Sequence, residues 1–209
     1  MNGLDFWEAR WAPYDEATYA AALAAIGPDD VVLDIGAGDL RLARRMAEVA
    51  RRVIAWEMQP GLLLTHELPH EESGIPRCRS HVGVRTPHNL TVVCTDARSE
   101  PVPPGVTVAV LLMRHCTHYA LYVGKLRAAG SRRLVTNARW RMGVEVIDLG
   151  PGVPFGSLAA GWYACRRCGA AGWAGEDAAA VNAATLENVT DVEGCPACRT
   201  WGCSLRDEL

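Results

Sequence analysis

Three acidic residues follow short apolar runs in the first half of the chain. Asp34 lies in the run VVLDIGAGD, Glu57 ends a second run and Asp96 follows a third. If these runs are parallel strands, their carboxyl ends meet at one edge of a sheet, which is where open α/β sheets bind ligands. Carboxylates at that edge could accept hydrogen bonds from the amine or hydroxyl groups of a ligand.

A glycine turn connects the Asp34 run to the segment that follows. Gly36 and Gly38 flank Ala37 in this turn. Glycine suits positions where φ must be positive or where a ligand presses against the backbone, and amides at a helix start can hold polar ligand atoms. A nicotinamide-binding turn would require a glycine at position 41, where this chain has Arg41. A turn that binds no ligand is the other alternative.

The segment from residue 31 to residue 39 resembles the first motif of the class I methyltransferases that use S-adenosylmethionine (SAM). In that motif an acid near the end of the first strand precedes a GxG turn into a helix. The resemblance implies that Asp34 faces the cationic, amine-bearing methionine end of SAM. It also implies that Glu57 accepts the ribose hydroxyls, and that Asp96 and the amide of Ala97 lie at the adenine.

The resemblance extends over about residues 11–148 and implies a set of cofactor-binding residues at the expected strand ends. These are Asp34, Gly36, Ala37, Gly38, Glu57, Met58, Asp96, Ala97 and Met113. The family often carries a third glycine after the GxG turn, whereas this chain has Leu40. The sequence therefore predicts a SAM site that departs from the family pattern at one position.

Around these residues the chain alternates between strand-like and helix-like segments. Apolar, β-branched runs indicate strands over 31–35, 52–58, 90–95, 106–113, 133–138 and 144–149. Helical spacing indicates helices over 11–26, 40–49, 61–68 and 118–128, and residues 71–89 are expected to form a loop or an insertion. This order predicts an α/β fold over residues 1–150: a Rossmann-like, mostly parallel sheet with helices on both faces.

Four cysteines near the C-terminal end form two CxxC pairs. Cys165 and Cys168 make the first pair, and Cys195 and Cys198 make the second. Four thiolates can enclose one tetrahedral zinc ion, which is typical of a structural site. The sequence predicts a zinc ribbon over residues 157–209, after a linker of Gly and Pro residues. A redox pair or unrelated buried cysteines are the alternatives, and Cys203 could replace a ligand or simply pack.

The segment after the expected fourth strand carries the candidate catalytic residues. His115 or His118 could act as a general base for an oxygen or nitrogen nucleophile, and Cys116 could be a nucleophile for carbon methylation. Each could equally be a packed or surface residue. Amino-group methylases of the family often show an acid or Asn, two prolines and an aromatic residue here, and this chain does not.

A histidine motif in the 66–70 segment partly fits a metal-binding signature. The residues from His66 to His70 fit the H-E-x-x-H signature of zinc proteases, but Pro69 would break the helix that must place both histidines on one face. A second metal site built from these histidines with Cys78 and His81 is an alternative to a surface loop.

Charge gives a weaker indication about the substrate. The net charge is −3, so the chain as a whole has no basic field that would attract nucleic acid. Six bases with no acid among them fall within residues 125–141: Lys125, Arg127, Arg132, Arg133, Arg139 and Arg141. They could form a phosphate-contacting rim or a solvated surface. Trp140 could stack on a base or belong to the core.

Together these features predict a SAM-dependent methyltransferase with SAM and structural zinc as cofactors and a macromolecular substrate, either RNA or protein. A non-catalytic SAM-binding or zinc-ribbon adaptor and a small-molecule methyltransferase are the alternatives. No apolar run approaches the roughly 20 residues of a bilayer span, and the first residues lack the basic and apolar regions of a signal peptide. We therefore expect a cytoplasmic protein with no membrane partner.

Overall fold

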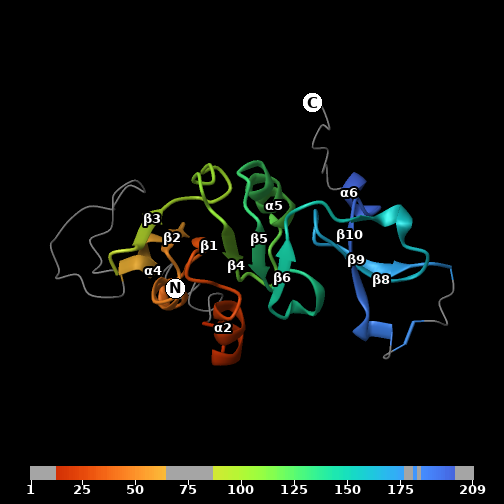
Figure 1. The fold of residues 1–209 in the computed structure, drawn as a ribbon, viewed down its shortest axis with the longest axis horizontal. Coiled ribbons are helices and arrows are strands. Elements are labelled where there is room, and N and C mark those ends of the chain that lie inside the picture. The colour runs from red at the N-terminus through yellow and green to blue at the C-terminus, as the bar shows by residue number, and fades with distance from the viewer. Residues whose placement is uncertain (1–12, 65–86, 177–180, 183–184, 201–209) are drawn as a thin grey trace, which may run out of the picture.

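The computed structural model describes residues 13–64, 87–176, 181–182 and 185–200, which form two β-sheets side by side (Figure 1). The strands of the large sheet are β1 (Val31–Ile35), β2 (Arg52–Glu57), β3 (Leu90–Cys94), β4 (Val108–Leu111), β5 (Arg133–Thr136) and β6 (Glu145–Asp148). Those of the small sheet are β7 (Val153–Pro154), β8 (Gly161–Cys165), β9 (Ala171–Ala174) and β10 (Val189–Glu193). The α-helices are α2 (Glu16–Leu23), α3 (Arg41–Ala47), α4 (Pro60–Leu64), α5 (Tyr119–Ala128) and α6 (Ala197–Thr200).

The large sheet confirms the predicted Rossmann-like architecture. Its strand order is β3-β2-β1-β4-β5-β6, and the first five strands are parallel. The order reverses between β1 and β4, and such a reversal opens a ligand crevice at the carboxyl ends of the strands. β6 runs antiparallel to β5, because the eight residues from 137 to 144 are too few for the crossover that a parallel strand needs.

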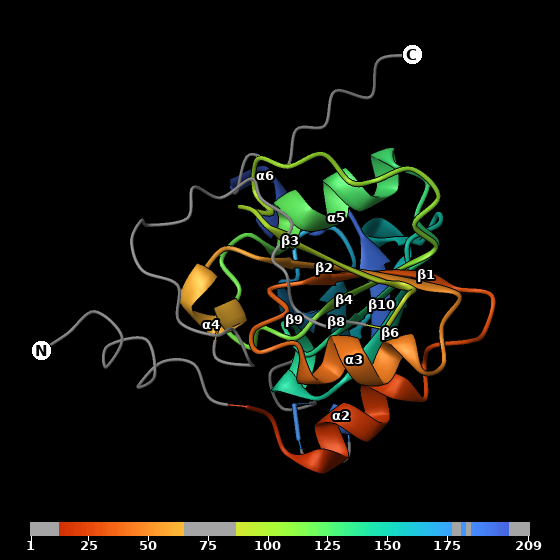
Figure 2. The same ribbon diagram turned by 90° about the vertical axis from the view of Figure 1, so that its left-hand side faces the viewer.

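Helices cover both faces of this sheet. Figure 2 shows α5 on one side of the strands and α3 with α2 on the other. Alternate residues of each strand therefore enter different cores: Val32 packs with α2 and α3, while Leu33 packs with α5. This double burial explains why the central strands β1, β2 and β4 are mostly apolar on both faces, whereas the edge strand β6 alternates with polar residues.

The first described helix is shorter than predicted. The expected helix over 11–26 appears as α2, which begins at Glu16 and ends at Leu23. Asp15 has extended backbone angles, and its carboxylate accepts a hydrogen bond from Thr18 N at 2.8 Å. Asp15 is thus the N-cap, and Pro13 and Tyr14 do not join the helix, while residues 11 and 12 lie outside the described part.

The predicted fourth strand is longer than the observed one, and several other predicted features lie outside the described residues. The strand expected over 106–113 is reduced to β4, because residues from 112 onward turn away into the wall of a cavity. Residues 65–86 lie outside the described part, and with them the H-E-x-x-H motif and most of the 71–89 loop; Cys203 lies outside it as well. Within the described part, no helix combines the length and the hydrophobicity that a bilayer span requires.

The small sheet docks on the large one through buried charge. The Arg139 side chain, from the β5–β6 connection, is 2% exposed. Its Nη2 lies 2.6 Å from Glu145 Oε2, and its Nη1 lies 2.7 Å from Asp191 Oδ1 on β10. Arg127 of α5 also pairs with Glu193 at the end of β10. The ribbon therefore packs against α5 and the β5–β6 edge through paired charges.

Candidate functional site

A cavity of about 670 Å³ opens at the carboxyl ends of β1 to β4. Of the eleven predicted site residues outside the cysteine cluster, ten line it: Asp34, Gly36, Ala37, Glu57, Met58, Asp96, Ala97, Met113, His115 and His118. Gly38 is the exception. The topology therefore gathers residues that are up to 84 positions apart in the sequence at one place.

Asp34 is a buried carboxylate with an unused hydrogen-bonding atom. The residue is 4% exposed, and its Oδ2 has no hydrogen-bond partner among the described residues. Burial, and after it the charge of Glu57, raises the pKa of Asp34 to about 7. A buried acceptor of this kind is costly unless a donor reaches it, so the geometry suits a ligand that brings a cationic amine.

The raised pKa predicts how the stability of the ligand-free protein depends on pH. Between pH 4 and pH 7 the folded chain holds the Asp34 proton more tightly than the unfolded chain does, so the contribution of this group to stability falls as pH rises through that window. Asp34→Asn should remove this decline. In urea unfolding, the variant should gain stability relative to the wild type between pH 5 and pH 8. An equal difference at both pH values would contradict the prediction.

Glu57 is held in place by two backbone amides. Its Oε2 accepts a hydrogen bond from Gly38 N at 2.9 Å, and its Oε1 accepts one from Gln59 N at 2.8 Å. The residue is 6% exposed and lines the cavity. Each oxygen retains acceptor capacity, so the carboxylate can receive two ligand hydroxyls. Gly38, which does not line the cavity, acts on the site through Glu57.

The glycine turn has the backbone that its sequence predicts, including the departure at its third position. Gly36 and Gly38 have φ of +74° and +56°, and Leu40 has φ of +66°. The positive φ of Gly36 strains any other residue there, and a Cβ would also lie 2.2 Å from Met113 Cε, so that the end of this flexible side chain would have to move. Leu40 adopts the left-handed conformation at a cost of about 1–2 kcal/mol, and its side chain offsets this by being buried at the base of α3.

Asp96 is engaged by a neighbouring arginine. Arg98 donates to its carboxylate from the backbone N and from the guanidinium, and these hydrogen bonds lower the pKa of Asp96 to about 2. Both side chains are partly exposed, at 34% and 46%, so this ion pair contributes little to stability. Arg98 can move aside at small cost and leave Asp96 free to accept from a ligand.

The candidate catalytic residues lie together on the loop after β4. His115 and His118 are exposed and line the cavity, and His118 Nδ1 lies 3.2 Å from Thr117 Oγ1. Cys116 is half-buried, and burial raises the pKa of its thiol. Because a thiolate is the reactive form, this shift disfavours Cys116 as a nucleophile. The two histidines are exposed to the cavity and stay the candidates for proton transfer.

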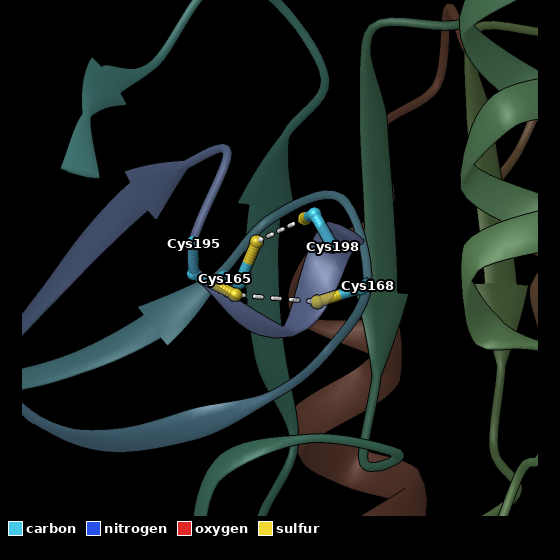
Figure 3. Close-up of side chains that lie close together, drawn as sticks. All are labelled: Cys165, Cys168, Cys195 and Cys198. Carbon is cyan, nitrogen blue, oxygen red and sulfur yellow. Dashed lines mark hydrogen bonds between the residues drawn. The ribbon is translucent and has the colours of Figure 1, made fainter. Parts of the chain in front are cut away.

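The four CxxC cysteines form one cluster in the small sheet (Figure 3). Their sulfur atoms all lie within 4.8 Å of one another, with Cys165 and Cys198 Sγ 3.6 Å apart and Cys168 and Cys195 Sγ 3.5 Å apart. A tetrahedral zinc with bonds of about 2.3 Å would separate its sulfurs by roughly 3.8 Å. The donor set and spacing therefore fit a zinc ion.

The comparisons with known proteins give similarities of limited extent. No protein-family model matches the chain, and neither does any curated protein. Three similar solved structures are the 23S rRNA methyltransferase ErmE (23% identity, TM-score 0.43), a dimethyladenosine transferase from Plasmodium falciparum (19%, 0.43) and a DhpI-SAM-HEP complex (15%, 0.42). The matches cover 59%, 58% and 63% of this chain, and 46%, 41% and 58% of those chains respectively.

Several cavity residues were not predicted from the sequence. Tyr14 and Tyr19 come from the N-terminal segment, and Arg98, Arg114 and Tyr122 come from the strand-end loop and α5. Sequence spacing assigned both tyrosines to a helix face, and nothing local indicated that this face meets a loop almost 100 residues later. A search for aromatic and cationic residues in the strand-end loops could have found Arg98 and Arg114.

The predicted phosphate rim over residues 125–141 is wrong for most of its members. Arg132 and Arg133 pair with Asp30 at the amino ends of the strands, on the edge opposite the cavity. The buried Arg139 and the Arg127 of α5 pair with acids as described above.

The two remaining bases of this set are also engaged within the chain. Lys125 donates to the backbone oxygens of Ala97 and Glu100, and Arg141 donates to Leu186 O and lies 3.3 Å from the Glu187 carboxylate. Trp140 packs against Trp162, with the ring centres 5.3 Å apart. These groups hold loops and the two sheets together and do not form one surface.

Proposed function

We propose that this protein is a SAM-dependent methyltransferase acting on a macromolecule, with residues 1–150 forming the SAM-binding domain and residues 157–209 a zinc ribbon. The observation that carries the proposal is the pair of buried carboxylates at the carboxyl ends of β1 and β2. Asp34 has an oxygen with no hydrogen-bond partner in the part of the chain that the structure describes, and Glu57, 23 positions later, is fixed by two amides. This pair matches a ligand with a cationic amine and vicinal hydroxyls.

Each residue has a role that follows from its position. Asp34 would accept from the amine of the methionine end, Glu57 from the ribose hydroxyls, and Asp96 from the adenine amine. Gly36 leaves space at the turn. When bound, SAM supplies an electrophilic methyl group with its own leaving group, so that positioning of the acceptor can provide much of the rate. His115 or His118 would remove a proton from the acceptor where one must leave.

The zinc ribbon has a structural role in this proposal. Cys165, Cys168, Cys195 and Cys198 would enclose the ion completely, which leaves no open position for a substrate. The ribbon packs on α5, whose first turn follows the His115–His118 loop, so that it supports one wall of the cavity. A rigid module beside the cavity suits an extended acceptor better than a metabolite.

Replacing Glu57 should weaken SAM binding without unfolding the protein. Glu57→Ala removes the acceptor for both ribose hydroxyls and should cost roughly 1–3 kcal/mol of binding free energy, which is about 5- to 150-fold in affinity. Isothermal titration calorimetry measures this directly. Glu48→Ala is the matched control, because Glu48 is an exposed glutamate just after α3 that does not line the cavity. Equal affinities of the two variants would contradict the assignment.

Methyl transfer from labelled SAM tests the function itself. The purified full chain is incubated with the RNA, protein and small-metabolite fractions of a cell extract, and label in each fraction is counted. We expect incorporation into a macromolecular fraction that disappears in the Asp34→Ala, Glu57→Ala double variant. Label only in small metabolites would favour a small-molecule enzyme. SAM binding with no transfer to any fraction would favour a non-catalytic adaptor.

A further inference from the structure

The cavity has an outer wall formed by Tyr14 and the loop after β4. The Tyr14 hydroxyl donates to Leu112 O at 3.2 Å and accepts from Arg114 N at 3.4 Å, so it bridges the backbone on both sides of Met113. Tyr14 is itself held by Tyr19: its backbone N donates to the Tyr19 hydroxyl at 3.1 Å, and the two rings meet edge to face. The N-terminal segment therefore fixes the conformation of this loop.

Arg114 is the arginine of this wall that has no ion pair with a described residue. Its guanidinium carbon lies 5.1 Å from the centre of the Tyr14 ring, and its side chain is exposed. The other cavity arginines are paired, Arg41 with Asp39 and Arg98 with Asp96. The charge of Arg114 reaches Asp15 weakly: the pKa of Asp15 is lowered first by its hydrogen bonds with Thr18, and Arg114 is the last of the causes.

The charges of the cavity are thus divided between two halves. The carboxylates of Asp34 and Glu57 lie in the buried half, where the proposed cofactor site is. The exposed half presents the Arg114 guanidinium, which lies over the Tyr14 ring, together with His115 and His118. These side chains offer hydrogen-bond donors and aromatic surfaces. This combination fits an anionic, aromatic acceptor.

Nucleic acid supplies both of these features. A guanidinium fork binds a phosphate through two parallel hydrogen bonds, and single-stranded RNA is recognised by stacking unpaired bases on aromatic rings or on arginine planes. An acidic peptide would pair with the positive charge of Arg114 but would leave the aromatic rings and the plane of the guanidinium without a stacking partner. From this arrangement we infer that Arg114, held by Tyr14, binds the phosphate chain of a single-stranded RNA acceptor at the mouth of the cavity. The inference rests on the proposed function of that cavity.

Fluorescence anisotropy of a labelled single-stranded oligoribonucleotide tests the inference. The full chain is titrated with SAM present, over a range of salt concentrations. Arg114→Gln should weaken RNA binding roughly tenfold and reduce the slope of log affinity against log salt by about 1. Arg132→Gln is the matched control, because Arg132 is an exposed arginine on the opposite edge of the sheet. It should bind RNA like the wild type.

A second variant separates the tyrosine from the arginine. Tyr14→Phe keeps the ring under Arg114 but removes the hydroxyl that bridges Leu112 and Arg114. It should weaken RNA binding several-fold with a smaller change of the salt slope, because the positive charge remains.

The outcomes distinguish this inference from the proposed function. If the wild type binds SAM but no RNA, or binds an acidic peptide instead, or if Arg114→Gln and Arg132→Gln lose affinity equally, the RNA surface is wrong and the SAM site stands. If the wild type fails to bind SAM by calorimetry, the proposed function itself fails, and the RNA inference fails with it.

Discussion

A Cys165→Ser variant is expected to lose its zinc and to melt well below the wild type. Cys165 is completely buried at the end of β8, and Cys168 lies in the turn that joins β8 to β9 in a hydrogen-bonded hairpin. In small zinc modules the metal supplies about 10–16 kcal/mol of apparent binding free energy, which is also their folding free energy. The small sheet buries too few apolar side chains to fold without that contribution.

Elemental analysis and thermal melting measure this effect together. Cys116→Ser is the matched control, because Cys116 is a half-buried cysteine that lies in the cavity and outside the cluster. It should keep one zinc per chain and a melting curve close to the wild type. Full zinc content and an unchanged melting curve in Cys165→Ser would rule out the structural site.

The second large effect is expected from the buried arginine between the sheets. Arg139→Ala leaves the Glu145 and Asp191 carboxylates without their shared cation, and because these carboxylates are 25% and 41% exposed the loss should be roughly 1.5–3 kcal/mol, below that of a fully buried pair. Urea unfolding measures the loss. Arg141→Ala is a control two residues away: its pair with Glu187 is exposed, at 46% and 72%, and should contribute about 1 kcal/mol or less.

The opposite ranking of these two arginines would show that the sheets are not held together by buried charge. A loss of only about 1 kcal/mol in both variants would have the same meaning. In either case the ribbon would be attached chiefly by the apolar contacts at its surface, such as the packing of Gly169 against the Tyr119 ring.

The central strands were predictable because each is buried on both faces. The run from Val31 to Ile35 is apolar except for Asp34, and the structure gives β1 the same bounds. The glycine turn after it was predictable for a local reason as well, since only positive φ values at Gly36 and Gly38 allow the chain to turn from β1 toward α3. Signals of this kind need no knowledge of distant residues.

The partners of the charged residues could not be predicted in the same way. Arg133 pairs with Asp30, 103 positions away, and Arg139 pairs with Asp191 in the other sheet. The sequence shows that these arginines exist but not which edge of the sheet they occupy, so six bases in one stretch suggested a single surface that the fold does not form. The link from Tyr14 to the loop after β4 depends on tertiary structure for the same reason.

The central claim is that the cavity at the carboxyl ends of β1 to β4 binds SAM. The most direct test is calorimetric titration of SAM into the wild-type chain and into the Asp34→Ala, Glu57→Ala double variant, with folding of both checked by circular dichroism. We predict saturable binding of one SAM per wild-type chain and a loss of more than roughly 100-fold in affinity in the double variant. Unchanged SAM affinity in a folded double variant, or no SAM binding by the wild type, would contradict the assignment.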